Sequence, residues 1–317
     1  MVMVWLSLLT ACAPPPAAPL VLGLGPWIGY DPFILAREER LVDGQRLKLI
    51  ELSSSTATMR HFRNGLLDLA AMTLDQALQL AAQGMDLRII AVLNESRGAD
   101  VVMVSPAMAG LHQLKGQVIV AESSTASVLM LRSLLDVAGL QAGDVQILPM
   151  ESSQHLGVLQ TRRAVAAISY EPMATRLAAS GYVRSLDSRQ LDARIMRVLV
   201  VRHEVLQQRA DDVDQVLRVW AAGLRQLEAD PQGAALVLAP SLEMASEAYL
   251  DAMEGLRQMT PADSLAYLAG VQAPLRQRGQ TLAEALMAMG QLTQAPDWNR
   301  LVDIGPAGRT QQPGERP

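Results

Sequence analysis

From Leu20 to about Pro172, short apolar runs alternate with segments of helical periodicity, and this alternation constrains the fold more than any other feature. Strands and helices that follow one another in this order build a mainly parallel sheet with helices on its faces. The expected strands form two sets, at 20–24, 47–52, 66–71 and 88–93, and then at 101–104, 118–121, 144–148 and 164–169. The pattern therefore predicts two α/β units in succession.

The remaining part of the chain returns to the first unit. A very apolar run from Ile195 to Val201 has no strand partner nearby in the sequence, so we expect it to cross back to the first set. After His203 the periodicity is helical. Three breaks that each contain one proline, at 230–231, 239–240 and 260–261, separate the segments near 211–229, 243–256 and 273–290. Residues 304–317 are rich in Gly, Pro, Arg and Gln and are expected to be a disordered tail.

Two loops of the first unit carry local signals for the start of a helix. Asp31 followed by Pro32 is typical of the N-cap and first position of a helix, which we expect to run to about Arg40. Thr73 and Gln76 have the spacing of a capping box for a helix that ends near Gln83. Both helices are therefore expected to begin directly after a strand or a short loop.

The single cysteine, Cys12, follows an apolar stretch that ends in Leu9-Thr10-Ala11 and precedes three prolines. The stretch is too short to span a bilayer, which takes about 20 residues, but it fits an export signal with a small-residue cleavage site. Leu-Thr-Ala-Cys resembles the lipobox of bacterial lipoproteins, in which the cysteine becomes the acylated first residue. We expect a signal peptide over 1–11, lipidation at Cys12 and a proline-rich tether over 12–19; the alternative is a lone buried cysteine.

Composition excludes several classes of function. Half of the residues are hydrophobic and 19% are charged, which favours a large buried core over disorder. The formal net charge of −5 and the lack of a basic stripe give no footprint for nucleic acid. After lipidation no thiol is left, the four histidines have no metal-ligand spacing, and no serine lies in a Gly-x-Ser-x-Gly turn. The sequence therefore predicts no metal, no cofactor and no catalytic residue.

Polar and aromatic side chains gather in the loops that lead from strands into helices. Ligands of open α/β sheets bind there, outside the carboxyl ends of the strands. Ser and Thr hydroxyls beside uncapped backbone N–H groups can hold an oxyanion without a formal positive charge, and nearby aromatic rings can supply apolar faces. Each of these residues taken singly is explained as a helix cap or a core residue, so the prediction of a site depends on their recurrence.

Five phrases of the sequence, in this order, resemble the nitrate/sulfonate/taurine-type solute-binding proteins of ABC importers. They are Gly25-Pro-Trp-Ile-Gly-Tyr-Asp-Pro32, Phe62-Arg-Asn-Gly-Leu-Leu-Asp68, Asn94-Glu-Ser-Arg-Gly-Ala-Asp100, Leu114-Lys-Gly116 and Ser169-Tyr-Glu-Pro-Met173. The resemblance implies an α/β, bilobed type II periplasmic-binding-protein fold, with two mainly parallel sheets and a ligand cleft between lobes that close by hinge rotation. It assigns 20–97 plus 200–303 to lobe one and 98–199 to lobe two, with hinge strands near 97–101 and 194–200.

The resemblance also implies which residues bind the ligand. They lie in the loops described above or near the hinge: Trp27, Tyr30, Ser54, Ser55, Thr73, Asn94, Glu122, Ser123, Ser124, Tyr170 and Glu171. The candidate loops contain no Lys, and only Arg97 lies beside the hinge, so a small hard dianion is disfavoured. Glu122, Glu171 and Asp75 favour a ligand with an amine or other donors, such as an aminosulfonate or a pyrimidine-like heterocycle.

The resemblance implies a lipid-anchored monomer on the periplasmic face of a membrane, which delivers a small organic solute to an ABC permease and its ATPase. A ligand sensor coupled to a membrane signalling protein is an alternative. A second alternative is an enzyme similar to the thiamine pyrimidine synthases, which share this fold and rely on an active-site Lys, a His and a cysteine-rich motif. Because Lys48 and Lys115 lie outside the candidate loops and Cys12 is the only cysteine, we expect no enzyme activity.

Overall fold

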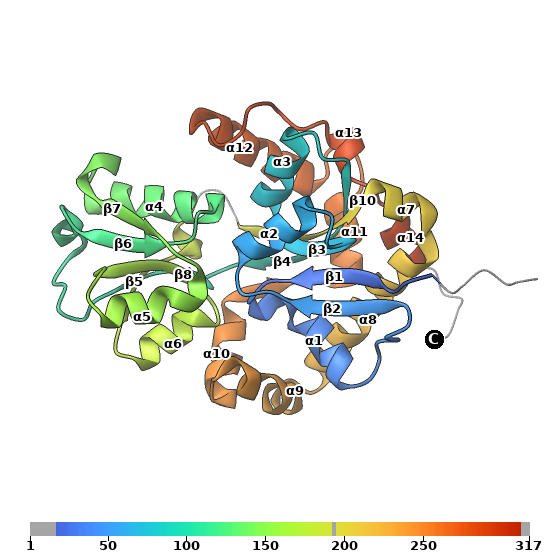
Figure 1. Ribbon diagram of the computed structural model, residues 1–317, viewed down its shortest axis with the longest axis horizontal. Helices are drawn as coiled ribbons and strands as arrows, with labels where there is room; N and C mark the ends of the chain where they lie inside the picture. Colours follow the sequence, from blue (N-terminus) through green and yellow to red (C-terminus); the bar gives the residue numbers. More distant parts are fainter. Residues whose placement is uncertain (1–16, 192–194, 312–317) are drawn as a thin grey trace, which may run out of the picture.

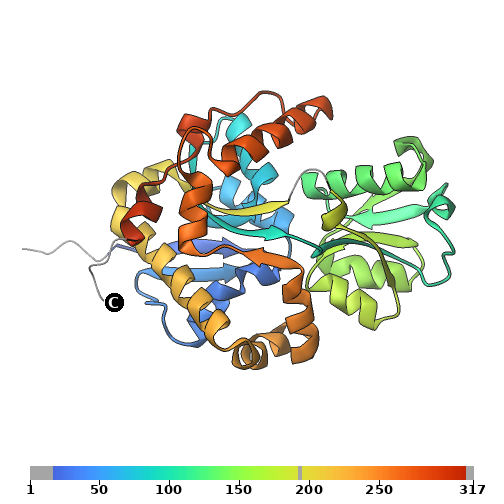
Figure 2. The ribbon, with the colours of Figure 1, turned by 180° about the vertical axis from the view of Figure 1, so that it is seen from behind.

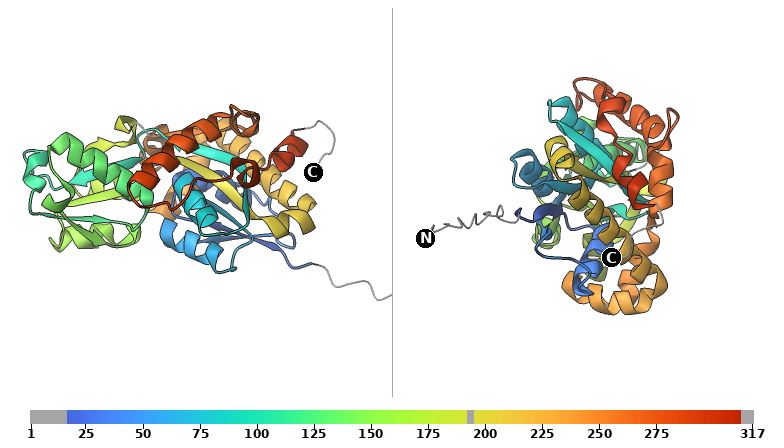
Figure 3. Two further views of the ribbon diagram at one scale, coloured as in Figure 1. Left: turned by 90° about the horizontal axis from the view of Figure 1, so that it is seen from above. Right: turned by 90° about the vertical axis from the view of Figure 1, so that its right-hand side faces the viewer.

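The computed structural model describes residues 17–191 and 195–311 of the 317-residue chain. The predicted signal peptide, Cys12 and the first part of the tether lie outside the described residues. Two α/β lobes lie next to each other along the longest axis of the molecule (Figure 1). The view from above shows the same row of two lobes (Figure 3, left). The predicted bilobed α/β architecture is therefore confirmed.

Lobe one is built on a six-stranded sheet with the order β11-β4-β10-β3-β1-β2. Its strands are β1 (Leu20–Leu24), β2 (Leu47–Glu51), β3 (Leu69–Thr73), β4 (Leu87–Ser96), β10 (Met196–Arg202) and β11 (Leu256–Gln258). Strand β1 pairs in parallel with β2 and β3, whereas β10 is antiparallel to β3 and β4. All residues of β3 and β4 are buried, as expected for central strands that helices cover on both faces.

Lobe two is built on a five-stranded sheet with the order β7-β6-β8-β5-β9. Its strands are β5 (Asp100–Val104), β6 (Val118–Ala121), β7 (Gln146–Pro149), β8 (Ala166–Tyr170) and β9 (Val183–Asp187). Strand β6 pairs in parallel with β7 and β8, and β5 is antiparallel to β8 and β9. Both sheets are thus mixed rather than mainly parallel, because the strand that crosses from the other lobe enters each sheet in the opposite direction.

Helices cover the faces of both sheets (Figures 1 and 2). Lobe two carries α4 (Thr125–Ala138), α5 (His155–Gln160) and α6 (Met173–Ala179). Lobe one carries α1 (Asp31–Glu38), α2 (Ser55–Arg63), α3 (Leu74–Ala82), α7 (His203–Gln208), α8 (Ala210–Ala229), α9 (Pro231–Leu238), α10 (Ser246–Glu254), α11 (Pro261–Leu268), α12 (Pro274–Ala288), α13 (Trp298–Leu301) and α14 (Gly305–Thr310). Within the described ranges, no helix combines the length and the apolar character needed to cross a membrane.

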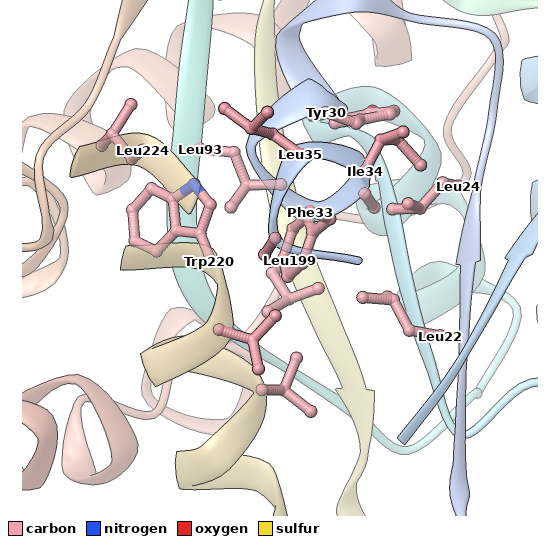
Figure 4. Close-up of a cluster of buried hydrophobic side chains, with 14 of the residues drawn as sticks. Leu22, Leu24, Tyr30, Phe33, Ile34, Leu35, Leu93, Leu199, Trp220 and Leu224 are labelled. Atoms are coloured by element: carbon pink, nitrogen blue, oxygen red, sulfur yellow. The ribbon is translucent and has the colours of Figure 1, made fainter. Parts of the chain in front are cut away.

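The packing of α1 between β1 and α8 forms the main core of lobe one. Phe33 of α1 is fully buried and lies between the leucines of β1 and Trp220 of α8 (Figure 4). Burying a side chain of this size contributes about 1.5–3 kcal/mol. Helix α8 approaches α1 so closely that a Cβ on Gly223 would lie 1.7 Å from the carbonyl oxygen of Pro32. This contact places the loop before α1 firmly above the sheet.

The chain crosses between the lobes at two places, and described residues from the two crossings are in contact (Figure 2). The first runs from β4 into β5 through Gly98, whose φ of 124° lies in a region that favours glycine. The second runs from β9 into β10. The Ser188 hydroxyl accepts a hydrogen bond from the Gly98 N–H at 2.8 Å and lies 2.7 Å from the hydroxyl of Ser96. These contacts join the two crossings, where the resemblance predicts the hinge.

Several boundaries differ from those expected. Strand β10 begins at Met196 and pairs with β3 and β4, so lobe one resumes about four residues before the predicted boundary at 200. Strands β9 and β11 were not predicted, because their exposed and partly buried residues lack an apolar run. The expected disordered tail is partly wrong: Arg309 of α14 pairs with Asp214 at 2.7 Å and Ala307 is buried, while 312–317 lie outside the described residues.

The start of α1 also differs from the prediction. A short 3-10 helix, η1 (Ile28–Tyr30), continues directly into α1, so Asp31 is the first helical residue and Tyr30 occupies the N-cap position. Asp31 is buried beside the Tyr249 hydroxyl, and this burial raises its pKa to about 8. Asp31, which we predicted to be an N-cap, is therefore a buried carboxyl group in the first turn of α1.

Candidate ligand-binding site

A small cavity lies between the two lobes, at the ends of strands from both sheets. Lobe one contributes Gly25, Pro26, Trp27, Tyr30, Ser55, Ala71, Thr73 and Arg197, and lobe two contributes Asp100, Ser124, Ala126, Ser127, Met130, Ile168, Ser169 and Tyr170. Six of the predicted binding residues are in this lining: Trp27, Tyr30, Ser55, Thr73, Ser124 and Tyr170. The structure thus brings together the aromatic and hydroxyl residues of separate loops.

Trp27 provides the main flat surface on the lobe-one side. Its indole N–H donates to Asn94 Oδ1 at 2.9 Å, and the Asn94 amide in turn donates to the carbonyl oxygen of Gly29 at 2.8 Å. A Cβ on Gly29 would lie 2.3 Å from the Trp27 indole nitrogen, so this packing requires glycine. Asn94 was predicted to bind ligand, but it is fully buried behind Trp27 and holds the indole ring in place.

Arg197 is the main residue that the sequence analysis missed. Its guanidinium carbon lies 3.4 Å from the centroid of the Trp27 ring, a cation–π geometry. The same guanidinium binds Asp100 through two hydrogen bonds of 2.7 and 2.9 Å, and both side chains are about 4% exposed. The sequence did hint at this residue, because Arg197 interrupts an apolar run that was predicted to be a buried strand, and a buried charge requires a partner. Arg97, the basic residue considered instead, is half exposed beside Glu95.

Hydroxyl groups and apolar side chains form the lobe-two wall. Ser124 is the N-cap of α4, where its hydroxyl accepts from the Ser127 N–H at 3.2 Å. The Tyr170 ring meets the Trp27 ring edge-on, with centroids 6.0 Å apart. The Ser169 hydroxyl lies 3.2 Å from Nδ1 of His155, a buried residue whose Nε2 lies 3.3 Å from the Met150 carbonyl. Burial lowers the His155 pKa to about 4, so this imidazole is neutral near pH 7.

Four other predicted residues lie outside the cavity lining. Glu171 is buried and accepts hydrogen bonds from the Thr175 backbone and from Arg184, both at 2.8–2.9 Å. Ser54 caps α2 by accepting from the Ala57 N–H at 3.0 Å, and Ser123 is exposed. Glu122 accepts from the Tyr170 hydroxyl at 2.8 Å, and burial raises its pKa. These carboxylates position the lobe-two wall and do not face the cavity directly.

Direct contacts hold the lobes together around the cavity. The Ser53 hydroxyl donates to Glu151 Oε2 at 2.9 Å, and the Thr56 hydroxyl donates to Glu122 Oε2 at 3.4 Å. A third contact is the ion pair between Arg176 of lobe two and Glu243 of lobe one, at 2.5 Å. Each contact joins one lobe to the other, so this arrangement is a closed one. Opening the cavity requires that these contacts separate.

The described residues offer no group of three or more His, Cys, Asp or Glu side chains that could hold a metal ion. The groups that line the cavity are hydroxyls, aromatic rings, and a guanidinium that already donates to a carboxylate. Such a set suits hydrogen bonding and stacking with a small organic molecule.

Two α/β lobes with exchanged strands and a cavity between them define the class of protein: the chain has the periplasmic-binding-protein fold. A family model described as the NMT1-like family matches residues 13–239, and the chain belongs to that family. A search of curated protein sequences found no match.

Solved structures share this fold at low sequence identity. The alkanesulfonate-binding protein SsuA of Xanthomonas axonopodis pv. citri, bound to MOPS, is 18% identical with a TM-score of 0.72, over 92% of this chain and 98% of that one. The periplasmic aliphatic sulphonate binding protein SsuA of Escherichia coli is 15% identical with a TM-score of 0.70, and the match covers 90% of this chain and 97% of that one. The periplasmic nitrate-binding protein NrtA of Synechocystis PCC 6803 is 13% identical with a TM-score of 0.75, and the match covers 93% of this chain and 90% of that one. The predicted resemblance is confirmed at the level of family and fold: the chain belongs to the NMT1-like family and shares the fold of these binding proteins.

Proposed function

We propose that this protein is an extracytoplasmic solute-binding component of an ABC importer, which closes its two lobes around a small organic solute. The observation that carries the proposal is the cavity between the lobes, whose lining combines strand-end residues from both sheets. Similar solved structures include proteins named for binding alkanesulfonate and nitrate, which supports a transport role. In the described part of the chain, no Lys, His or Cys lines the cavity, which supports binding without catalysis.

The cavity chemistry favours a neutral or zwitterionic ligand over a small inorganic anion. Arg197 is the cationic side chain among the described lining residues, and Asp100 neutralises it through two hydrogen bonds. An anion without other polar groups would therefore enter a site with no net positive charge. Trp27 and Tyr170 offer apolar ring faces, and the serine hydroxyls offer donors and acceptors. An aminosulfonate or an amino-substituted heterocycle matches this combination.

Calorimetric titration of the purified protein tests the proposal. We expect binding within a panel of taurine, ethanesulfonate, 4-aminopyrimidine, pyrimidine and nitrate, with nitrate the weakest. Trp27→Ala is expected to weaken binding by about 30-fold, because removal of a buried aromatic contact typically costs about 2 kcal/mol. Tyr182→Ala, outside the cavity lining, is the control and should leave affinity unchanged. Absence of binding to every panel member, or equal affinity for the Trp27 variant, would contradict the proposal.

We also propose that Cys12 is lipidated and holds the protein on the periplasmic face of a membrane, close to its permease. A diacyl anchor makes membrane attachment stable, and the proline-rich tether separates it from lobe one. Cys12→Ser is expected to move the exported protein from the membrane fraction to the soluble periplasmic fraction, and to remove the acyl mass. Membrane association that persists in this variant would rule out the anchor.

A further inference from the structure

A second hollow adjoins the ligand cavity at the boundary between the lobes. Helix α4 begins there, in contact with α3 of lobe one (Figure 1). Ser124, Ser127 and Ile168 line both hollows, and two of these three side chains are short. We name the second hollow the α4 groove, which is lined by Val128, Leu131, Ile147 and Pro149 of lobe two and by Gln79 and Gln291 of lobe one.

The ligand cavity alone is too small for a whole organic solute. Its volume is about 30 Å³, which gives room for about two water molecules. The α4 groove has a volume of about 300 Å³, the size at which binding sites for small organic molecules begin. A solute held by the closed lobes must therefore place part of its structure outside the cavity, and the α4 groove is an adjoining space for it.

Aliphatic side chains form the middle of the α4 groove. Val128 and Leu131 are half-buried there, and Ile147 is 41% exposed. Among the described lining residues, Glu122 is the one charged side chain, and its buried carboxylate already accepts from the Tyr170 hydroxyl. The groove thus offers apolar contact and no free charge. A hydrocarbon chain gains from such a surface, whereas a charged group does not.

The apolar surface continues outward along α4. Val128 and Leu131 also line a third hollow, together with Leu135 of α4 and Met289 of lobe one. A helix rises about 1.5 Å per residue, so the stretch from Ser124 to Leu135 covers about 16 Å. This length accommodates several carbon atoms beyond the cavity.

We infer that the α4 groove holds the apolar tail of an elongated solute whose polar head lies in the cavity against Trp27 and Tyr170. The inference rests on the proposed function and names the shape of its ligand: a polar head with an unbranched hydrocarbon tail, instead of a compact molecule that the lobes enclose entirely. Both lobes line the groove, so contacts with the tail stabilise the closed arrangement.

Two series of probes with growing tails test the α4 groove by calorimetry: N-alkyltaurines and 4-(alkylamino)pyrimidines, each with methyl, butyl and hexyl chains. In at least one series we expect affinity to rise about 2-fold per methylene, or about 30-fold from methyl to hexyl, because an open groove buries about half of each methylene. Val128→Asp should reduce this gain to about 3-fold. It should leave the affinity for the methyl compound unchanged, because Val128 lies outside the cavity lining.

Val137→Asp is the matched control. It places the same substitution on the same helix, at a position that is 58% exposed and lines neither the α4 groove nor the third hollow, so the full gain should remain. Ile147→Asp, on the exposed strand β7, repeats the test if Val128→Asp does not fold, and should reduce the gain in the same way.

The gain is a ratio of affinities measured in one protein, so a partial loss of folded protein does not change it. Equal affinity of the wild type for the methyl and hexyl members would overturn the tail subsite and favour a protein partner for the groove, while leaving the proposed function intact. A gain that persists in both Val128→Asp and Ile147→Asp would overturn it as well, as would its loss in Val137→Asp. Absence of binding to every compound would count against both the subsite and the proposed function.

Discussion

The two lobes share one strand arrangement but differ in what they contribute to the cavity. In lobe one, β2, β1 and β3 lie in parallel and β10 arrives from lobe two in the opposite direction; in lobe two, β7, β6 and β8 lie in parallel and β5 arrives from lobe one. Each crossing strand pairs in the antiparallel direction with the third parallel strand. The start of the crossing strand and the carboxyl ends of the parallel strands therefore meet at the cavity. The shared topology therefore places the site, whereas side chains define its chemistry.

The walls differ in how firmly they are held. In lobe one, Trp27 is fixed by Asn94 and stacked on Arg197. In lobe two, the lining is mainly hydroxyls at the start of α4 and apolar groups, and its hydroxyls bond to one another. This difference indicates a rigid aromatic platform in lobe one and a set of hydroxyl groups in lobe two.

The lobes also bury titratable groups of opposite type. Burial favours the neutral form of either group, so it raises the pKa of Asp31 in lobe one to about 8 and lowers the pKa of His155 in lobe two to about 4. Lobe one is therefore expected to lose stability as pH rises, and lobe two as pH falls.

The largest expected effect concerns Asp31. The folded protein keeps this proton up to about pH 8, whereas the unfolded chain loses it near pH 4, so stability is full at low pH and falls as pH rises through this window. The contribution is on the order of 5 kcal/mol. Urea unfolding at several pH values should show a smaller decline in Asp31→Asn than in the wild type. Identical pH profiles for the two proteins would contradict the assignment.

The next effect concerns the ion pair that joins the crossing strands. Arg197→Met leaves Asp100 buried without its partner, which is expected to destabilise the protein by about 3–5 kcal/mol in urea unfolding. Adding Asp100→Asn removes the uncompensated charge and should restore much of this loss. A cost below about 1 kcal/mol in the single variant would show that the pair does not hold the lobes at the hinge.

His155 should act in the opposite direction to Asp31. The unfolded chain takes up this proton below about pH 6.5, whereas the folded protein resists it until about pH 4, so stability falls as pH is lowered through this range. The expected loss is about 3 kcal/mol. His155→Gln should flatten the decline between these pH values. A wild-type profile without this decline would mean that His155 is protonated in the folded state.

The smallest effect compares two helix caps, one from each lobe. Ser54→Ala and Ser124→Ala each remove a hydroxyl that accepts from a backbone N–H, and each should cost about 1 kcal/mol of stability. Only Ser124 lines the cavity, so only its variant should also weaken solute binding in calorimetry. Equal effects on affinity would remove the distinction between the two walls.

Local signals were sufficient for much of the fold. The run Leu20–Leu24 and the apolar run near 196–201 predicted strands close to those observed, because a buried strand requires apolar residues throughout. Strand β9 was missed because Val183, Arg184 and Ser185 are exposed at the edge of its sheet. The sequence could not show that edge position, which depends on pairing with β5.

The candidate site was predictable only in part. Thr73 ends β3 and Trp27 lies in the loop after β1, where the topology brings the ends of parallel strands together, so their place followed from the pattern. Glu171 lies equally close to a strand end, but its side chain turns to Thr175 and Arg184. Arg197 lies within a strand and reaches the cavity because β10 crosses between the lobes.

The sequence by itself determined the α/β class, the two sets of strands and the loops in which a site could form, because periodicity and helix-start residues act over a few positions along the chain. Only the tertiary structure decided that Arg197 meets Asp100 over Trp27, and that Asn94 lies behind the same indole ring. These pairs are far apart in the sequence, and their approach depends on two chain crossings and on the contact between lobes. Side-chain chemistry names the possible partners, but packing selects which of them meet.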